Sequence, residues 1–215
     1  MNYDLVIFDM DGTILDTLED LKNSTNYALK QSGYPEHPLE NIRQFVGNGI
    51  QKLIERAVPE GTSEADRQKV YEAFRAHYKV HCADNTKPYD GIPDLIIKLR
   101  EAGIKTAVVS NKADPAVQDL VIEYFPNMFD VSVGEKPGVA KKPAPDAVDF
   151  VLETLSIPRE RAVYIGDSDV DIATAENSHM DSIIVTWGFR DLEFLKAHGA
   201  KTIVDTTEEI LELLL

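Results

Sequence analysis

The sequence predicts an α/β protein with a doubly wound parallel sheet and an α-helical segment inserted after the first strand. From residue 93 onward, short apolar segments of strand length alternate with segments of helical spacing. This alternation is typical of parallel sheets whose strands are joined by right-handed helical crossovers. Between residues 16 and 87 the spacing of apolar residues is helical and shows little strand pattern, so that stretch predicts a separate small bundle.

The composition is that of a globular protein with an acidic surface. Hydrophobic residues make up 43% of the 215 residues, and 22 Lys and Arg face 37 Asp and Glu, which gives a net charge of -15. This charge repels nucleic acids and anionic membranes, so we expect neither as a partner. It also repels anionic substrates at long range, so a phosphate site in this chain needs local positive charge.

Cysteine usage and hydropathy bear on location. Cys82 is the only cysteine, so no disulfide is expected within the chain. No segment approaches the about 20 consecutive apolar residues of a membrane helix, and no targeting segment precedes the first strand. We therefore expect a cytoplasmic protein.

The first strand is expected at residues 5–8, a short apolar run suited to burial on both faces of a sheet. It runs into Asp9-Met10-Asp11-Gly12-Thr13. Because α/β proteins bind ligands at the carboxyl ends of their strands, Asp9 is expected at such a crevice. Gly12 permits a sharp turn, and the Thr13 hydroxyl can donate to a neighbouring carboxylate. The alternative is an ordinary helix start with Asp11 or Thr13 as a cap.

The segment after this turn predicts an inserted helical domain. Its helices are expected from Leu18 to Gly33, from Ile50 to near Pro59, and from Thr62 to about Cys82. The turn-rich stretch 83–91 is the expected return to the sheet. The predicted domains are therefore a core of residues 1–15 and 88–215 and a helical domain of residues 16–87.

The remaining elements are expected to complete the sheet and its helical layers. Strands are predicted at 104–109, 129–133, 161–165, 182–186 and 201–204, and helices at 93–102, 114–124, 145–155, 169–178 and from Thr207. Ser110 and Asn111 follow the strand at 104–109, so Ser110 is expected at the same sheet edge as Asp9. The serine hydroxyl and the Asn111 N–H group can both donate to phosphate oxygens, although a helix cap is the ordinary alternative.

Two more polar segments occur before helices. Lys142 precedes Pro143-Ala144-Pro145, whose prolines stiffen the backbone before a helix. Asp167 follows the strand at 161–165 and a glycine, and Asp171 lies in the first turn of the next helix. A solvated basic loop is the alternative for Lys142, and stabilisation of a helix start is the alternative for Asp171.

The segment from Asp9 to Thr13 resembles the first motif of the haloacid dehalogenase superfamily, aspartate-nucleophile phosphohydrolases with a Rossmann-like core. The resemblance implies three further motifs in order, and Ser110, Lys142 and the pair Asp167 and Asp171 occupy them. The segments at 45–49, 89–92 and 108–112 are most similar to phosphoglycolate phosphatase-like members. Those relatives more often carry Thr where this chain has Ser110.

This resemblance implies a Mg²⁺-dependent phosphatase acting on a small phosphorylated metabolite, with phosphoglycolate as the leading candidate. Asp9 would attack phosphorus, and Asp11 would protonate the leaving group and activate water, with Thr13 orienting Asp11. Metal ligands would be the Asp9 and Asp167 carboxylates and the Asp11 main-chain carbonyl. Asp171 would support the metal site, and the phosphoryl group would be bound by Ser110, Asn111 and Lys142.

The inserted domain would act as a cap that selects the ester. Gly47 and Asn48 are the candidate substrate ligands, because N–H groups exposed at a helix start can receive a carboxylate. Arg43 and Lys52 are further candidates, and Asn48 as a simple helix N-cap is the alternative. Cap hinges are expected near residues 14–17 and 85–89.

Other functions stay open. A phosphomutase of the β-phosphoglucomutase type would use the same motifs, and an inorganic pyrophosphatase is a further alternative. A binding module without catalysis is disfavoured, since each catalytic position is occupied. We expect a monomer or a homodimer.

Overall fold

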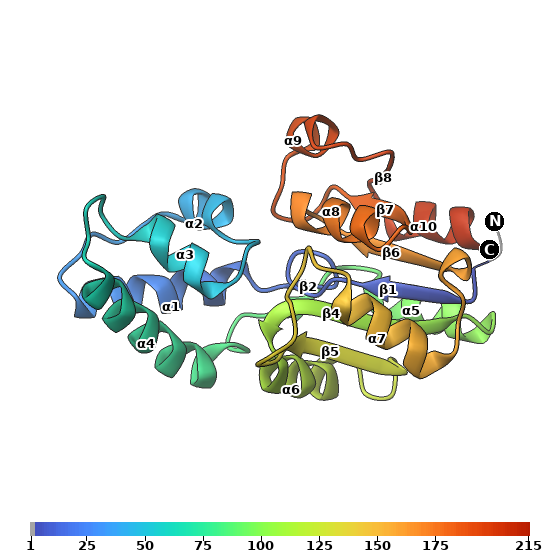
Figure 1. Ribbon diagram of the computed structural model, residues 1–215, viewed down its shortest axis with the longest axis horizontal. Helices are drawn as coiled ribbons and strands as arrows, with labels where there is room; N and C mark the ends of the chain where they lie inside the picture. The colour runs from blue at the N-terminus through green and yellow to red at the C-terminus, as the bar shows by residue number, and fades with distance from the viewer. Residues whose placement is uncertain (1–2) are drawn as a thin grey trace. The chain divides into compact units, whose positions relative to one another are not determined.

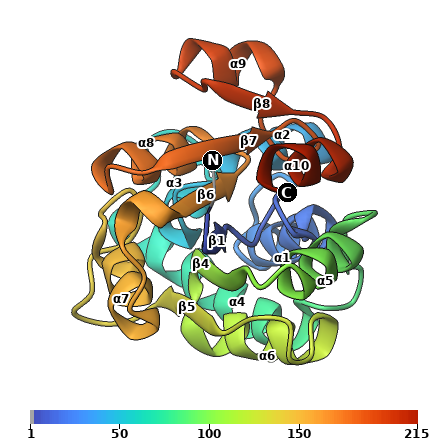
Figure 2. The ribbon, with the colours of Figure 1, turned by 90° about the vertical axis from the view of Figure 1, so that its right-hand side faces the viewer.

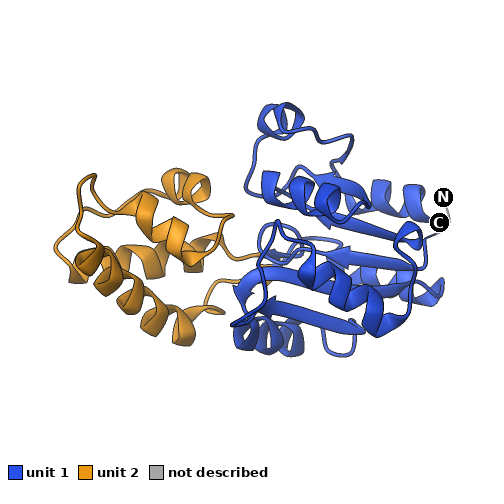
Figure 3. Cartoon of the chain, in the orientation of Figure 1, with its two compact units in different colours: residues 1–15, 88–215 blue, residues 16–87 orange. Residues whose placement is uncertain are grey.

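The computed structural model describes residues 3–215, which form two compact units. Figure 3 colours the first, described here from residue 3 to Leu15 and from Pro88 to Leu215, in blue, and the second, Asp16–Lys87, in orange. We call them the core unit and the inserted unit. No helix among residues 3–215 combines the length and the hydropathy needed to span a bilayer.

The core unit is built on a six-stranded sheet with the order β5-β4-β1-β6-β7-β8, in which all neighbouring strands are parallel. The strands are β1 (Leu5–Phe8), β4 (Lys105–Ala113), β5 (Val131–Glu135), β6 (Ala162–Gly166), β7 (Asp181–Val185) and β8 (Thr202–Val204). The predicted α/β class is confirmed. From β1 the chain first adds strands on one side and then on the other, so the strand order reverses between β1 and β6.

Helices cover both faces of this sheet. They are α5 (Ile92–Glu101), α6 (Asp114–Tyr124), α7 (Asp146–Leu155), α8 (Asp169–Asn177), α9 (Leu192–Ala197) and α10 (Thr207–Leu214), with a 3-10 helix at Arg159–Arg161. Figure 1 gives their order along the chain, and Figure 2, which looks along the strands, shows α7 and α8 on one face and α5 and α10 on the other. This cover explains why all four residues of β1 are fully buried.

The inserted unit consists of α1 (Leu18–Gln31), α2 (Leu39–Phe45), α3 (Ile50–Ala57) and α4 (Glu64–His81). Leu21, Ala28 and Leu29 of α1 and Phe74 of α4 are buried in its interior. Ser63 caps α4 by accepting a hydrogen bond from the Asp66 N–H, as expected for a helix opened by Thr62-Ser63-Glu64.

The two passages between the units are short strands that pair with each other, β2 (Leu15–Asp16) and β3 (Lys87–Pro88). Close to them, the buried Asp20 carboxylate on α1 accepts hydrogen bonds from the backbone N–H and side chain of Asn85 and from the backbone N–H and hydroxyl of Thr86, at 2.8–3.0 Å. This anchoring argues against bending at Asn85 and Thr86, two residues of the predicted hinge.

Several elements differ from the sequence predictions, among them β2, β3 and the 3-10 helix, which were not expected. Helices α2 and α9 were not expected, because each buries a single residue, Ile42 or Leu195, and one buried position creates no periodic pattern. Strand β4 continues to Ala113 instead of ending at residue 109, with an irregular register against β5 after Val109. Ser110, Asn111 and Lys112 therefore belong to the strand.

Candidate active site

Asp9 lies where the two central strands end. Phe8 pairs with Ile165 of β6 and with Val108 of β4, and the Asp9 N–H donates to the Ile165 carbonyl at 2.8 Å. The carboxyl ends of β1 and β6 therefore lie together at Asp9, beside the middle of β4, at the point where the strand order reverses. Ligand sites of open α/β sheets form at such points.

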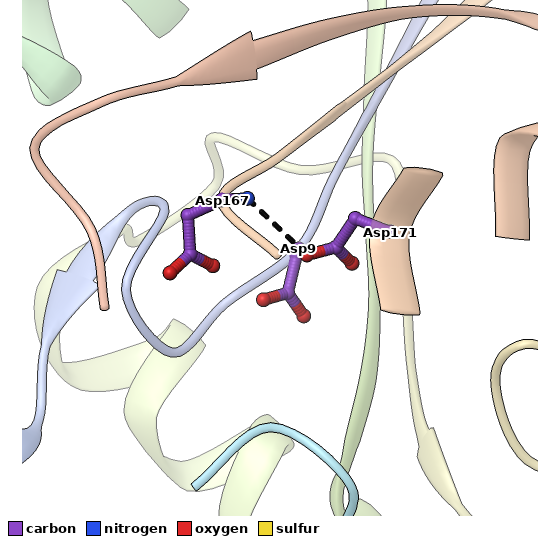
Figure 4. A group of neighbouring side chains, drawn as sticks. All are labelled: Asp9, Asp167 and Asp171. Carbon is purple, nitrogen blue, oxygen red and sulfur yellow. Dashed lines mark hydrogen bonds between the residues drawn. The ribbon is translucent and has the colours of Figure 1, made fainter. Parts of the chain in front are cut away.

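Three buried carboxylates gather at this edge, those of Asp9, Asp167 and Asp171 (Figure 4). Each offers an oxygen that lies within 4.8 Å of the others. Burial raises the pKa of Asp9 well above its ordinary value, against the opposing effect of Lys142. Burial and then the charge of Asp171 raise the pKa of Asp167 to about 7. Both shifts disfavour the ionised carboxylates, so a cation bound beside them would stabilise their charged forms.

Both carboxylate oxygens of Asp171 accept hydrogen bonds from neighbouring protein groups. Its Oδ2 accepts hydrogen bonds from the backbone N–H groups of Asp167 and Ser168, at 3.2 and 3.1 Å, and from the Ser168 hydroxyl at 2.6 Å. Its Oδ1 accepts hydrogen bonds from the Lys142 ammonium and the Tyr164 hydroxyl. Ser168 in turn caps α8, so the start of this helix fixes the position of Asp171.

Asp9 and Asp167 are better suited to hold a cation. One oxygen of Asp9 accepts a hydrogen bond from Lys142, and no group of residues 3–215 donates to the other. Hard oxygen donors with excess negative charge fit Mg²⁺, which binds through one or two carboxylates and keeps several waters. The donor set of the site thus fits a magnesium ion held by Asp9 and Asp167 and supported by Asp171.

Lys142 is the central cation of the cluster. Its Nζ donates to Asp9 Oδ1 at 2.6 Å, to Asp171 Oδ1 at 2.8 Å and to the Tyr164 hydroxyl at 2.9 Å. Burial disfavours the charged form of this lysine, whose side chain is 4% exposed, but Asp171 and Asp9 outweigh burial and raise its pKa well above the usual value. Lys142 is therefore a fixed ammonium beside Asp9.

Ser110 and Asn111 lie on β4, just beyond its last pair with β1. Ser110 is buried, and its Oγ accepts a hydrogen bond from the Lys112 N–H at 3.2 Å. The Asn111 side chain donates to the Lys142 carbonyl at 3.0 Å. Asn111 therefore helps to hold the loop that carries Lys142, a contact that the sequence analysis did not foresee.

The prediction that Thr13 orients Asp11 is wrong for this structure. The buried Thr13 hydroxyl donates to Asp167 Oδ1 at 3.2 Å, whereas Asp11 is paired with Lys112. The cause is the turn at Gly12, whose φ of +89° brings the backbone against the Asp167 carboxylate. Thr13 thus supports a candidate metal ligand instead of the candidate general acid.

The loop after β7 also holds Asp167, which sequence reasoning missed. The Phe189 N–H donates to Asp167 Oδ2 at 2.7 Å, and Trp187 Nε1 donates to the Thr13 carbonyl at 3.0 Å. Gly188 lies between them, and a Cβ at that position would overlap Asp167 and the Gly12 carbonyl oxygen. Backbone donors leave no pattern in a sequence, and Gly188 alone was too weak a signal.

We expect Gly188→Ala to lower the affinity for Mg²⁺ at least about tenfold, because the added methyl group must displace Asp167 or the loop that orients it. The measurement is a calorimetric titration of the folded protein with MgCl₂. The matched control is Gly103→Ala, at a positive φ of +86° with open space around it, which should lose some stability but keep its Mg²⁺ affinity. Equal affinities for Gly188→Ala and the wild type would contradict this account of the loop.

The candidate substrate ligands of the inserted unit lie around the start of α3. Gly47 has a φ of +116°, and the Asn48 side chain accepts a hydrogen bond from Arg56 at 2.7 Å. Gly49 and not Asn48 is the N-cap of α3, so the alternative of Asn48 as a cap is wrong. Lys52 pairs with Glu55 at 2.6 Å, and Arg43 lies on α2.

Comparisons with known proteins show what this chain is similar to. The family model for haloacid dehalogenase-like hydrolases matches residues 6–185. The phosphoglycolate phosphatase of Aquifex aeolicus is 32% identical over 186 residues, which cover 86% of this chain and 85% of that protein. The N-acetylmuramic acid 6-phosphate phosphatase of Pseudomonas aeruginosa is 30% identical over 219 residues, covering 100% and 96%.

A solved structure is similar over the whole chain. The crystal structure of a protein from Lactobacillus delbrueckii subsp. bulgaricus, provisionally described as a phosphoglycolate phosphatase, has 44% sequence identity and a TM-score of 0.96. The similarity covers 100% of this chain and 99% of that one. It therefore includes both compact units.

Proposed function

Because the chain belongs to the haloacid dehalogenase-like hydrolases, we propose that it hydrolyses a small phosphate monoester with Mg²⁺ through an aspartyl-phosphate on Asp9. The resemblance noted in the sequence is confirmed, and so is the enzyme class, a phosphoric monoester hydrolase. The observation that carries the proposal is the Asp9 carboxylate, with one oxygen fixed by Lys142 and the other accepting from no described group.

In the first step Asp9 attacks phosphorus and the ester P–O bond breaks, while Asp11 gives its proton to the leaving alkoxide. In the second step water attacks phosphorus, Asp11 takes a proton from this water, and the bond from Asp9 to phosphorus breaks. Inorganic phosphate leaves, and both carboxyl groups return to their starting states. The chemistry that bound Mg²⁺ supplies is neutralisation of the phosphoryl charge.

The other polar groups of the site have supporting roles in this proposal. Asp9, Asp167 and the Asp11 main-chain carbonyl would hold the metal, with Asp171 behind them. Lys142 lowers the repulsion between Asp9 and the incoming phosphate, since its ammonium already touches Asp9. The Ser110 hydroxyl and the Asn111 N–H group would donate to phosphoryl oxygens. Together with the Lys142 ammonium, these hydrogen-bond donors would offset the long-range repulsion of a phosphate by a chain of net charge -15.

Phosphoglycolate is the leading substrate in our proposal. The names of the Aquifex and Pseudomonas relatives both specify an acid that carries a carboxylate besides its phosphate. In this chain residues 16–87 would form a cap domain and residues 1–15 and 88–215 the core domain, with Gly47 and Asn48 receiving the carboxylate. A cytoplasmic location fits the single cysteine, and the substrate is then a small phosphorylated metabolite.

The test is phosphate release from phosphoglycolate, several sugar phosphates and inorganic pyrophosphate, each with MgCl₂ and with EDTA. We expect release that requires Mg²⁺ and is fastest for phosphoglycolate. Phosphorus NMR of the same reactions distinguishes the alternatives, because a mutase would isomerise a sugar phosphate without releasing phosphate. A metal-loaded protein that released phosphate from no ester would contradict the proposed function.

A further inference from the structure

Lys112 is a second buried lysine at the sheet edge, and it contacts the candidate general acid. Its Nζ donates to Asp11 Oδ1 at 2.8 Å and to Asp11 Oδ2 at 3.1 Å. The Lys112 side chain is 4% exposed and the Asp11 side chain 22%. No sequence pattern suggested this pair, because the two residues are 101 positions apart. Asp11 follows β1, and Lys112 lies on the neighbouring strand β4.

We propose that Lys112 is the positioning residue of Asp11, fixing the carboxylate where it exchanges a proton with the leaving group. This inference rests on the proposed function. The backbone of the turn is held by the Met10 carbonyl, which accepts hydrogen bonds from the N–H groups of Ile14 and Leu15 at 3.0 Å. Within residues 3–215, the only hydrogen bonds to the Asp11 side chain come from Lys112, so the turn sets its Cα and Lys112 sets its carboxylate.

The contact to both oxygens restrains the rotation of the carboxylate as well as its place. Charge-assisted hydrogen bonds of this kind are short and strong, and they hold a short side chain in one orientation. A general acid must lie within hydrogen-bond distance of the atom that it protonates, so the loss of this restraint costs rate even when the acid is present.

The two buried lysines of the site contact different carboxylates. Lys142 contacts Asp9 and Asp171, and Lys112 contacts Asp11. Lys112 is itself fixed from β4, where its backbone N–H donates to the Ser110 hydroxyl oxygen. Strand β4 thus carries the candidate phosphate ligand Ser110 and also, through Lys112, positions the Asp11 carboxylate. Both groups are held by the same strand.

The experiment compares two phosphoryl donors of nearly equal size, the ester ethyl phosphate and the mixed anhydride acetyl phosphate. Ethoxide is a poor leaving group that needs a proton, whereas acetate leaves without one. Because kcat/KM covers only the steps through release of the leaving group, Lys112→Met should lower it about 10- to 100-fold for ethyl phosphate and less than about threefold for acetyl phosphate. Lys112→Arg, which keeps a donor to both oxygens, should restore most of the loss.

Three controls make the outcome decisive. Asp11→Asn should show the same difference between ethyl phosphate and acetyl phosphate, with a larger loss for ethyl phosphate. The thermal unfolding temperature of Lys112→Met checks that the variant is folded, and Lys112→Gln provides a second variant that can donate a hydrogen bond without charge. An equal loss of activity on ethyl phosphate and acetyl phosphate would overturn the inference, since Lys112 would then act on the phosphoryl group or on the fold.

Phosphoglycolate separates positioning from substrate binding. If Lys112→Met impaired phosphoglycolate but left ethyl phosphate unchanged, Lys112 would bind the substrate carboxylate and the positioning role would be wrong. A wild-type enzyme that was inert toward all three compounds would overturn the proposed function and this inference together. Wild-type activity without the difference between ethyl phosphate and acetyl phosphate in Lys112→Met would overturn the inference alone.

Discussion

Replacing Asp9 by Asn removes hydrolysis of every ester that the wild-type enzyme accepts, with an expected loss in kcat of at least about a thousandfold. An amide oxygen carries no charge to attack phosphorus and donates poorly to a divalent cation, so the nucleophile and a metal ligand are lost together. The fold should persist, because Lys142 keeps its ion pair with Asp171 at 2.8 Å.

The measurement is the initial rate of phosphate release at saturating ester and MgCl₂. The matched control is Asp149→Asn, a carboxylate on α7 of the same unit that pairs with Arg159 at 2.7 Å. Its activity should stay at the wild-type level, since Asp149 lies outside the acidic cluster. A residual rate above about one percent for Asp9→Asn would mean that another group attacks phosphorus, and the aspartyl-phosphate would have to be abandoned.

Replacing Lys142 by Met should lower the free energy of unfolding by about 3–5 kcal/mol, because it leaves Asp9 and Asp171 buried without their cation. For a protein of this length such a loss corresponds to a decrease of roughly 6–20 °C in Tm. Hydrolysis should fall as well, since Asp9 would lose the donor that fixes one of its oxygens.

Calorimetric or fluorescence melting curves recorded without metal measure this effect. Lys141→Met is the matched control, since Lys141 is exposed and its Nζ lies 4.0 Å from Glu135 Oε1, so its change should stay within about 0.5 kcal/mol. Adding Asp171→Asn to Lys142→Met should recover part of the lost stability, because only one buried carboxylate then lacks a partner. An unchanged Tm for Lys142→Met would show that the carboxylates find another partner or take up protons at little cost.

The sequence predicted the functional residues that lie at the ends of recognisable strands. A fully buried strand such as β1 is a continuous apolar run, and the acid that ends it marks a strand end and a candidate nucleophile at once. Asp167, just after the buried strand β6, likewise marks a strand end and a candidate metal ligand. Parallel topology then places these ends at one edge, and the structure brings Asp9, Asp167, Asp171 and Lys142 together there.

Contacts between distant residues could not be predicted in this way. The pair of Asp11 with Lys112 and the hydrogen bond from the Phe189 N–H to Asp167 depend on how neighbouring strands and loops register in space. The hydroxyl of Tyr164, which accepts from Lys142, lies inside an apolar strand where the sequence indicates only packing. Polar contacts to buried aromatic residues and to backbone groups leave no spacing rule to detect.

The anchoring of Asn85 and Thr86 by Asp20 bears on how this architecture could diversify. In residues 16–87 the last residues are hydrogen-bonded to the first helix, and the flanking strands β2 and β3 pair with each other. These contacts within the segment offset the entropy cost of bringing its two ends together. An inserted segment therefore only has to connect Leu15 to Pro88, whose strands lie side by side. Residues 16–87 behave as a self-closed module, which could be lengthened, trimmed or grafted without rebuilding the strands that carry the carboxylates.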